Sequence, residues 1–132
     1  MQIYLLDFNE KMVDAWKRHF HPIFDDVAPV EFVQSDFGTF MEKHASDIDT
    51  VVSPANAYGL MDGGYDEALT KYFGNELQLM VQKKIVQELY GEQPVGTSIS
   101  LKIPHRNIRL IHTPTMRTPS EIKDQTIIYQ CM

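Results

Sequence analysis

The stretch Val51-Val-Ser-Pro-Ala-Asn-Ala-Tyr-Gly-Leu-Met-Asp-Gly-Gly-Tyr-Asp66 holds the clearest structural pattern in the sequence. It begins in a short apolar strand, which we expect to cover Asp49–Ser53 and to be broken by Pro54. A glycine-rich loop follows, and Asp66 opens a helix. Adjacent glycines permit positive φ and let the backbone approach a ligand closely, so their N–H groups can face a diphosphate. The same residues also form ordinary turns and helix caps, so a purely structural role stays open.

Strands and helices alternate on both sides of this stretch. Apolar runs predict strands at Met1–Asp7, Val30–Gln34, Gly96–Ile103 and Ile108–His112. Helical spacing predicts helices after Asn9 as N-cap, over 37–44, over 66–73, from Asn75 as N-cap to Gly91, and from Ser120 as N-cap onward. This alternation indicates an α/β fold with a largely parallel sheet, in which ligands lie beyond the carboxyl ends of the strands.

Composition limits the classes of function. The 132 residues, 43% of them hydrophobic, suit one domain over residues 1–132, and the absence of an apolar span or a leader pattern predicts a cytoplasmic protein without a membrane partner. A net charge of −6 argues against binding of a nucleic-acid backbone. The single Cys131 excludes an intrachain disulfide and a cysteine zinc site. His19 and His21 lack metal-ligand spacing, so we expect no metal and no cofactor.

Three segments resemble motifs of the macro domain family, which binds ADP-ribose. Ala55-Asn56, Gly63-Gly64 and Asp66 match the family's first ligand-binding loop without a gap. Gln34-Ser-Asp36-Phe37 resembles its strand-end Gly-Asp-Ile, and Leu110-Ile-His-Thr-Pro-Thr-Met-Arg117 resembles the strand that follows its long helix. The motifs stand in the family's order. The resemblance therefore implies a three-layer α/β/α sandwich with a mixed, largely parallel sheet.

The resemblance also implies roles in binding. Asp36 would accept a hydrogen bond from the adenine amino group, with the Phe37 backbone N–H beside it. From the residues alone, Asp36 is equally well read as the N-cap of the helix that follows. The Asn56 amide would hydrogen-bond the distal ribose. Gly63 and Gly64 would lie along the phosphates.

Two residues that follow complete the expected site. Tyr65 would line the substrate site, although the family more often has a small aliphatic residue there. Asp66 would pair with Asn56 near the distal ribose and activate a water molecule. The resemblance thus implies binding of ADP-ribose or of an ADP-ribosylated substrate, with hydrolysis of mono-ADP-ribosyl or O-acetyl-ADP-ribose esters. The alternative is a reader or sequestering module without catalysis, in which Asp66 is only a cap.

The sequence departs from the family in the binding loop and at its end. Ser53-Pro54 stands in place of the usual Asn-Ala, and Met61-Asp62 replaces two glycines. The family's second phosphate loop and its adenine-flanking aromatic follow the last helix, so we expect the C-terminal helix-strand portion to be lacking. The incomplete edge would then leave Ile122, Ile127 and Ile128 poorly covered and allow association with another chain.

Overall fold

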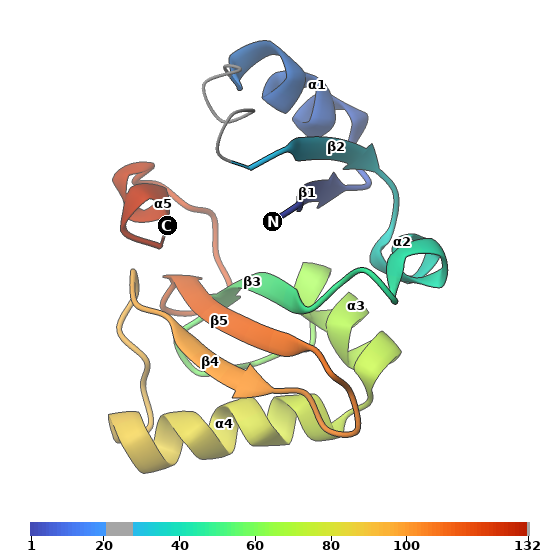
Figure 1. Ribbon diagram of the computed structural model, residues 1–132. Coiled ribbons are helices and arrows are strands. Elements are labelled where there is room, and N and C mark those ends of the chain that lie inside the picture. Colours follow the sequence, from blue (N-terminus) through green and yellow to red (C-terminus); the bar gives the residue numbers. More distant parts are fainter. Residues whose placement is uncertain (21–27, 132) are drawn as a thin grey trace. The chain divides into compact units, whose positions relative to one another are not determined.

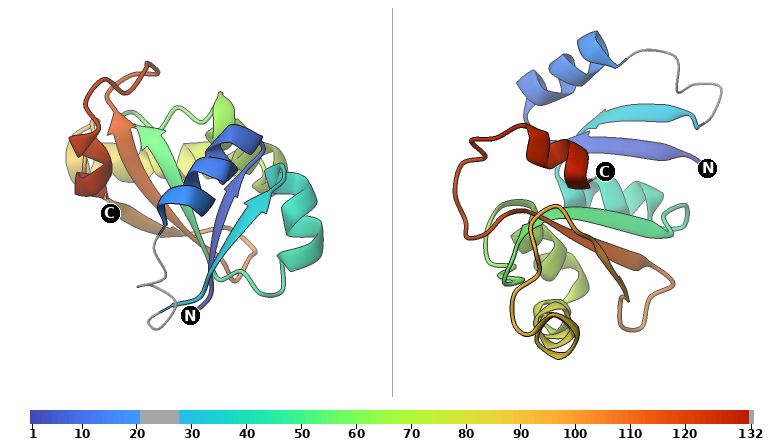
Figure 2. Two further views of the ribbon diagram at one scale, coloured as in Figure 1. Left: turned by 90° about the horizontal axis from the view of Figure 1, so that it is seen from above. Right: turned by 90° about the vertical axis from the view of Figure 1, so that its left-hand side faces the viewer.

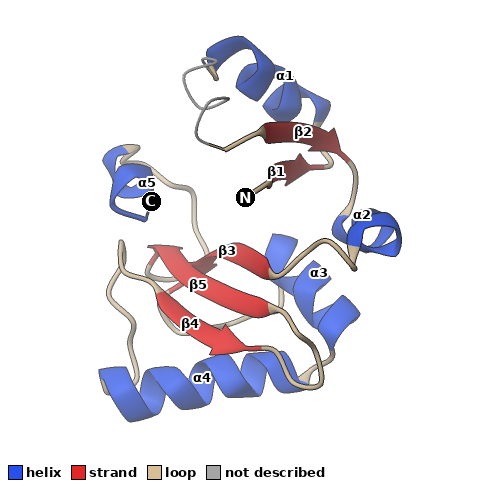
Figure 3. Cartoon of the chain, in the orientation of Figure 1, coloured by secondary structure: helices blue, strands red, loops and turns tan. Residues whose placement is uncertain are grey.

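The computed structural model describes residues 1–20 and 28–131, which form two compact units, Met1–Ala45 and Ser46–Met132 (Figure 1). His21, part of the histidine pair considered above, lies outside the described residues. Each unit contains both strands and helices (Figure 3). The α/β class is therefore confirmed, whereas a single domain over residues 1–132 stays a prediction.

The first unit is a two-stranded parallel sheet with two helices. Its elements are β1 (Ile3–Asp7), α1 (Glu10–His19), β2 (Val30–Gln34) and α2 (Phe37–His44). The Asn9 side chain accepts a hydrogen bond from the Lys11 N–H, so Asn9 caps α1 as predicted. Phe37, Phe40 and Met41 share one helical face of α2 and are buried, which is why this short segment folds as a helix.

The second unit carries the glycine loop. Its elements are β3 (Thr50–Asn56), α3 (Gly64–Phe73), α4 (Glu76–Leu89), β4 (Ile99–Lys102), β5 (Arg109–Met116) and α5 (Thr126–Cys131). The strand order is β3-β5-β4, with β3 parallel and β4 antiparallel to β5, so the sheet is mixed. The helices α3 and α4 lie on one side of this sheet and α5 on the other (Figure 2). Apolar side chains from α3, α4, β4 and β5 form the core, among them Leu69, Leu77, Val81, Ile85, Leu101 and Leu110.

The predicted break at Pro54 is wrong, because β3 continues through Pro54 to Asn56. Pro54 pairs in register with Thr113 of β5, the only strand to which β3 is hydrogen-bonded in this unit's sheet. A proline lacks an N–H but is tolerated where that side of the strand needs no ladder hydrogen bond. The longer strand carries Asn56 to the carboxyl edge of the sheet.

The neighbouring strands also differ in length from the prediction. β4 is shorter, covering Ile99–Lys102, whereas β5 runs past His112 to Met116. Pairing between β3 and β5 extends as far as Asn56 and Met116, with a register shift just before them. Both strands of the parallel pair therefore end at the loop that follows Asn56.

Three predicted helix boundaries are also wrong. Helix α3 begins at Gly64, two residues before Asp66. Helix α4 begins directly after Asn75, as predicted, although the Asn75 side chain makes no capping hydrogen bond; the helix ends at Leu89, with Tyr90 and not Gly91 as its left-handed C-cap. Ser120 does not cap a helix; α5 begins only at Thr126, whose N–H and hydroxyl bond to Asp124 Oδ1. Across the described ranges, no helix is long and apolar enough to cross a membrane.

Candidate functional site

Asn56 is the last residue of β3, and its side chain organises the loop that follows. It is buried, with 5% of its surface exposed. Its Oδ1 accepts hydrogen bonds from the N–H groups of Tyr58 (3.2 Å) and Leu60 (3.1 Å), and its Nδ2 donates to the Leu60 carbonyl (2.7 Å). An amide has two N–H donors, and within residues 1–20 and 28–131 the Leu60 carbonyl is the one acceptor found for Nδ2. Asn56 therefore fixes the backbone of the loop with three hydrogen bonds and has a second Nδ2 hydrogen without a partner in the described part of the chain.

The loop after β3 contains Gly59, which packs closely against α4, and Gly63 and Gly64, which are open to solvent. Gly59 has φ +64°, and a Cβ there would lie 2.7 Å from Val81 Cγ1, so this glycine allows the loop to approach α4 closely. Gly64 has φ +58°, and Gly63 and Gly64 are exposed, with no atom within 4 Å of the position of a Cβ. Space beside the start of α3 is therefore open at the two glycines that the sequence assigned to the phosphates.

Asp66 lies in the first turn of α3 and is 6% exposed. Its Oδ1 accepts a hydrogen bond from the hydroxyl of the fully buried Ser53 on β3. Burial raises the pKa of Asp66 to about 6, the Ser53 hydrogen bond opposes this rise, and the negative charge of the exposed Asp62 adds to it. A carboxyl group with a pKa near neutrality is suited to exchanging a proton.

Tyr65, between Gly64 and Asp66, is half-buried in the first turn of α3. Burial raises the pKa of its phenol above the ordinary value, and the neighbouring Asp66 carboxylate raises it further. The tyrosine is therefore neutral at physiological pH and can serve as a hydrogen-bond donor.

Asp36 and Phe37 belong to the first unit. Asp36 is the N-cap of α2: its Oδ1 accepts a hydrogen bond from the Thr39 N–H (2.9 Å), and this bond holds the pKa of the carboxyl below its usual range. The structural reading of Asp36 is thus confirmed. The side chain is nevertheless exposed, and a carboxylate has a second oxygen that can accept from a ligand. The Phe37 ring is buried in the unit.

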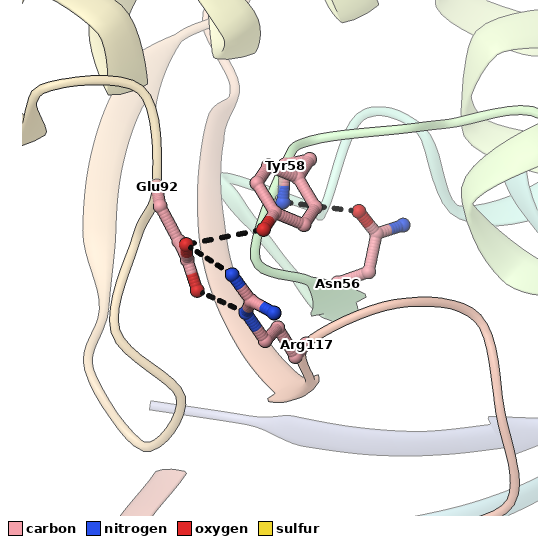
Figure 4. Close-up of polar contacts among 4 residues, drawn as sticks. All are labelled: Asn56, Tyr58, Glu92 and Arg117. Atoms are coloured by element: carbon pink, nitrogen blue, oxygen red, sulfur yellow. Dashed lines mark hydrogen bonds and ion pairs between the residues drawn. The ribbon is translucent and has the colours of Figure 1, made fainter.

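Sequence reasoning missed a polar cluster beside Asn56. Arg117 donates from Nε (2.7 Å) and Nη2 (3.0 Å) to the two carboxylate oxygens of Glu92, and the Tyr58 hydroxyl donates to the same carboxylate (3.1 Å; Figure 4). The Arg117 guanidinium also lies 5.7 Å from the centre of the Tyr58 ring. The hydrogen-bonded partners are 34 positions (Tyr58 and Glu92) and 25 positions (Glu92 and Arg117) apart in sequence, so no local pattern could reveal them. The sequence signal for Arg117 was its place at the end of the segment that resembles the family's strand after the long helix.

A second polar pair lies deeper in the same unit. The Nδ1 of His112 is 2.7 Å from Gln93 Oε1, and both residues are fully buried. An amide oxygen can only accept, so Nδ1 carries the hydrogen, and burial lowers the pKa of His112 to about 4. This histidine is therefore neutral and structural. Over residues 1–20 and 28–131, no three His, Cys, Asp or Glu residues are grouped so that they could hold a metal ion.

Comparisons with known proteins place the second unit in a family. The model of the Macro domain family matches residues 52–132. No curated protein matches the chain significantly. Among solved structures, an Oceanobacillus iheyensis macrodomain with a glycine-to-valine mutation and ADPR is 27% identical, with a TM-score of 0.53 over 64% of this chain and 47% of that one.

Two further structures of the same bacterial macrodomain agree. The structure with ADP is 28% identical, with a TM-score of 0.52 over 64% of this chain and 46% of that chain. An asparagine-to-alanine mutant is 27% identical, with a TM-score of 0.52 over 63% and 44% of the two chains. The present chain thus spans less than half the length of each solved structure that it matches. Since the family model matches residues 52–132, which is more than half of the chain, the chain belongs to the macro domain family.

Proposed function

We propose that this protein binds ADP-ribose or a derivative of it through the segment from Asn56 to Asp66. The observation that carries the proposal is the open space at Gly63 and Gly64, the N-cap and the first residue of α3. The solved relatives with ADPR and with ADP support it, since they share this fold at 27% and 28% identity.

The phosphates would bind at the start of α3. The first turn of a helix leaves backbone N–H groups without intrahelical partners and carries a partial positive charge. Gly63 and Gly64 have no side chain to keep a diphosphate away from that turn. Two carboxyl groups, Asp62 and Asp66, oppose an anion here, and the charge of Asp66 is lost only as the pH falls below its pKa of about 6.

The sugar and the base would use polar groups outside this turn. Asn56 would donate its remaining Nδ2 hydrogen to a hydroxyl of the distal ribose. In the first unit, the family resemblance assigns the adenine amino group to the Asp36 carboxylate oxygen that does not cap α2. A carboxylate there disfavours a base that presents a carbonyl group at that position, because two acceptors would face each other.

Hydrolysis of an ADP-ribose ester is the finer proposal, and the pKa of Asp66 near 6 favours it. A deprotonated Asp66 would accept a proton from the water that attacks the ester carbonyl or the anomeric carbon, while Asn56 holds the ribose. The competing reader function is favoured by the bond from Ser53, which already occupies one oxygen of the Asp66 carboxylate. Turnover by the Asp66 variants, described in the Discussion, separates the two.

A matched pair of glycine variants tests the binding proposal. Gly64 and Gly74 both have positive φ and open space at the Cβ position, so alanine is strained at either site, but only Gly64 lies in the proposed phosphate loop. We expect Gly64→Ala to weaken ADP-ribose binding about tenfold or more, as for one or two lost backbone contacts, and Gly74→Ala to leave it unchanged. Equal affinities of the two variants for ADP-ribose would contradict the proposal.

A further inference from the structure

We infer that Tyr58, Glu92 and Arg117 form a clamp that positions Asn56 for the distal ribose. The inference rests on the proposed binding of ADP-ribose, to which it adds positioning residues. None of the three needs to touch the ligand. Their role is to hold the loop that determines where the Asn56 amide points.

The backbone on both sides of the clamp is already joined. The Ala57 N–H donates to the carbonyls of Met116 (3.0 Å) and Arg117 (3.2 Å), so the loop after β3 is attached to the end of β5. The Ala57 carbonyl accepts from the Gln93 N–H (2.9 Å), which attaches the same residue to the segment after α4. Glu92 and Arg117 therefore belong to the two segments that flank Ala57.

The side chains add a directional link between these segments. Arg117 meets Glu92 with two N–H groups in a fork, a geometry that fixes the relative orientation of the two groups. The same hydrogen bonds hold the pKa of Glu92 below its usual range, so the carboxylate is charged at neutral pH. Tyr58 donates its hydroxyl to this carboxylate and lies against the guanidinium. The Tyr58 side chain is thus restrained at its ring and at its hydroxyl.

Restraint of Tyr58 is transmitted to Asn56 by one hydrogen bond. The Tyr58 N–H is one of the two donors to Asn56 Oδ1, so a shift of the Tyr58 backbone alters the orientation of the amide (Figure 4). The free Nδ2 hydrogen turns with that amide. Loss of the clamp should therefore weaken contacts to the distal ribose more than contacts to the phosphates at Gly63 and Gly64.

ADP provides the comparison that isolates this effect, because it has the adenosine and diphosphate but lacks the distal ribose. We would measure the dissociation constants of ADP-ribose and ADP for the chain and for Tyr58→Phe, Glu92→Gln and Arg117→Lys. Glu88→Gln is the matched control, since Glu88 forms an exposed ion pair with Lys84 (2.7 Å) on α4. Arg117→Lys keeps the charge but not the fork.

The expected result is a fall in the preference for ADP-ribose over ADP. Glu92→Gln and Tyr58→Phe should each reduce the ratio of the two affinities about threefold to tenfold, the effect of one weakened hydrogen bond, with ADP affinity unchanged. The double variant that combines Tyr58→Phe with Glu92→Gln should lose little more of the preference for ADP-ribose than Glu92→Gln alone, because both changes act through the hydrogen bond between Tyr58 and Glu92. Arg117→Lys should be intermediate, and Glu88→Gln should match the parent.

Two results would overturn the inference in distinguishable ways. If the parent binds ADP-ribose no more tightly than ADP, the proposed contact of Asn56 with the distal ribose is refuted, and with it the role of the clamp in positioning Asn56. If the parent prefers ADP-ribose and Glu92→Gln retains that preference, the proposed binding stands and only the clamp is refuted. A loss of affinity for both ligands in equal proportion would also refute it, because that outcome indicates general destabilisation.

Discussion

Ser53 on β3 donates its hydroxyl hydrogen to the carboxylate of Asp66 on α3, and both residues are buried. The hydrogen bond joins the middle of β3 to the first turn of α3, so it links the two elements that flank the glycine loop. Burial favours the protonated carboxyl, and the Ser53 hydrogen bond favours the charged form. Burial is the larger effect, so the pKa of Asp66 rises to about 6 and its charge changes close to physiological pH.

Asp66 and His112 should make the stability of the fold depend on pH in opposite directions. The raised pKa of Asp66 (about 6) stabilises the fold fully below its unfolded pKa near 3.8, and this contribution is lost as the pH rises through 6. The lowered pKa of His112 (about 4, from 6.5) stabilises the fold above pH 6.5, and this contribution is lost as the pH falls towards 4.

Single variants should reveal the two contributions. When the pH is lowered from 7 to 5, the free energy of unfolding of Asp66→Asn should fall relative to that of the parent by about 1 to 2 kcal/mol, because the variant lacks the protonation that stabilises the parent. The free energy of unfolding of His112→Asn should rise relative to that of the parent by a similar amount, because the variant has no buried histidine to protonate. Urea unfolding at the two pH values measures both. Parallel pH profiles for the parent and both variants would show that neither group titrates as its burial implies.

Asp66→Ala separates catalysis from binding. If Asp66 is the general base, the change should lower turnover of O-acetyl-ADP-ribose or of an ADP-ribosylated carboxylate by about a hundredfold or more, while ADP-ribose affinity moves by no more than about tenfold. Turnover by the parent should rise with pH through about 6, because the base acts when deprotonated. Full turnover in Asp66→Ala would assign the base elsewhere, and tight binding without turnover in the parent would identify a reader.

Asp36→Ser tests adenine recognition without removing the helix cap. Serine caps helices about as well as aspartate, so α2 should remain folded, whereas Asp36→Ala should also lose about 1 kcal/mol of stability. Both variants should bind ADP-ribose more weakly by about 1 to 3 kcal/mol, the cost of a lost charge-assisted hydrogen bond. Calorimetry checks the affinity and circular dichroism the fold. Parent-like affinity in Asp36→Ser would leave Asp36 with a capping role alone.

Gly59→Ala should destabilise the second unit. The added methyl group would meet Val81 Cγ1 at 2.7 Å, and φ is +64°, so we expect a loss of about 1 to 3 kcal/mol in unfolding free energy. Gly91→Ala is the control, because Gly91 also has positive φ (+97°) but no atom within 4 Å of the Cβ position. Thermal unfolding of both variants measures the difference. Equal losses would show that close packing against α4 does not require glycine.

Elements governed by local chemistry could be predicted from the sequence. The apolar run Val30–Gln34 is a strand with those bounds, and the spacing of apolar residues after Asp36 gave the bounds of α2. The Asn9 cap depends only on residues within one helical turn. Asp36 shows the limit of such reasoning, because a carboxylate suits both a helix cap and a ligand, and the residue type alone does not separate the two roles.

Features set by tertiary contacts could not be predicted. Whether Pro54 ends a strand depends on which side of β3 needs a ladder hydrogen bond, and that is decided by the partner strand. Asn75 takes the predicted N-cap position of α4, but its backbone is right-handed helical and its side chain makes no capping hydrogen bond. The ion pair of Glu92 with Arg117 joins residues 25 positions apart and becomes visible only once α4 and β5 are placed.

Calorimetric titration of the chain with ADP-ribose, ADP and AMP measures whether the loop from Asn56 to Asp66 holds ADP-ribose. We expect saturable binding at one site, with affinity decreasing from ADP-ribose to ADP to AMP as the distal ribose and then a phosphate are removed. Absence of saturable binding to a chain that is folded by circular dichroism, or equal affinities for ADP-ribose and AMP, would contradict it.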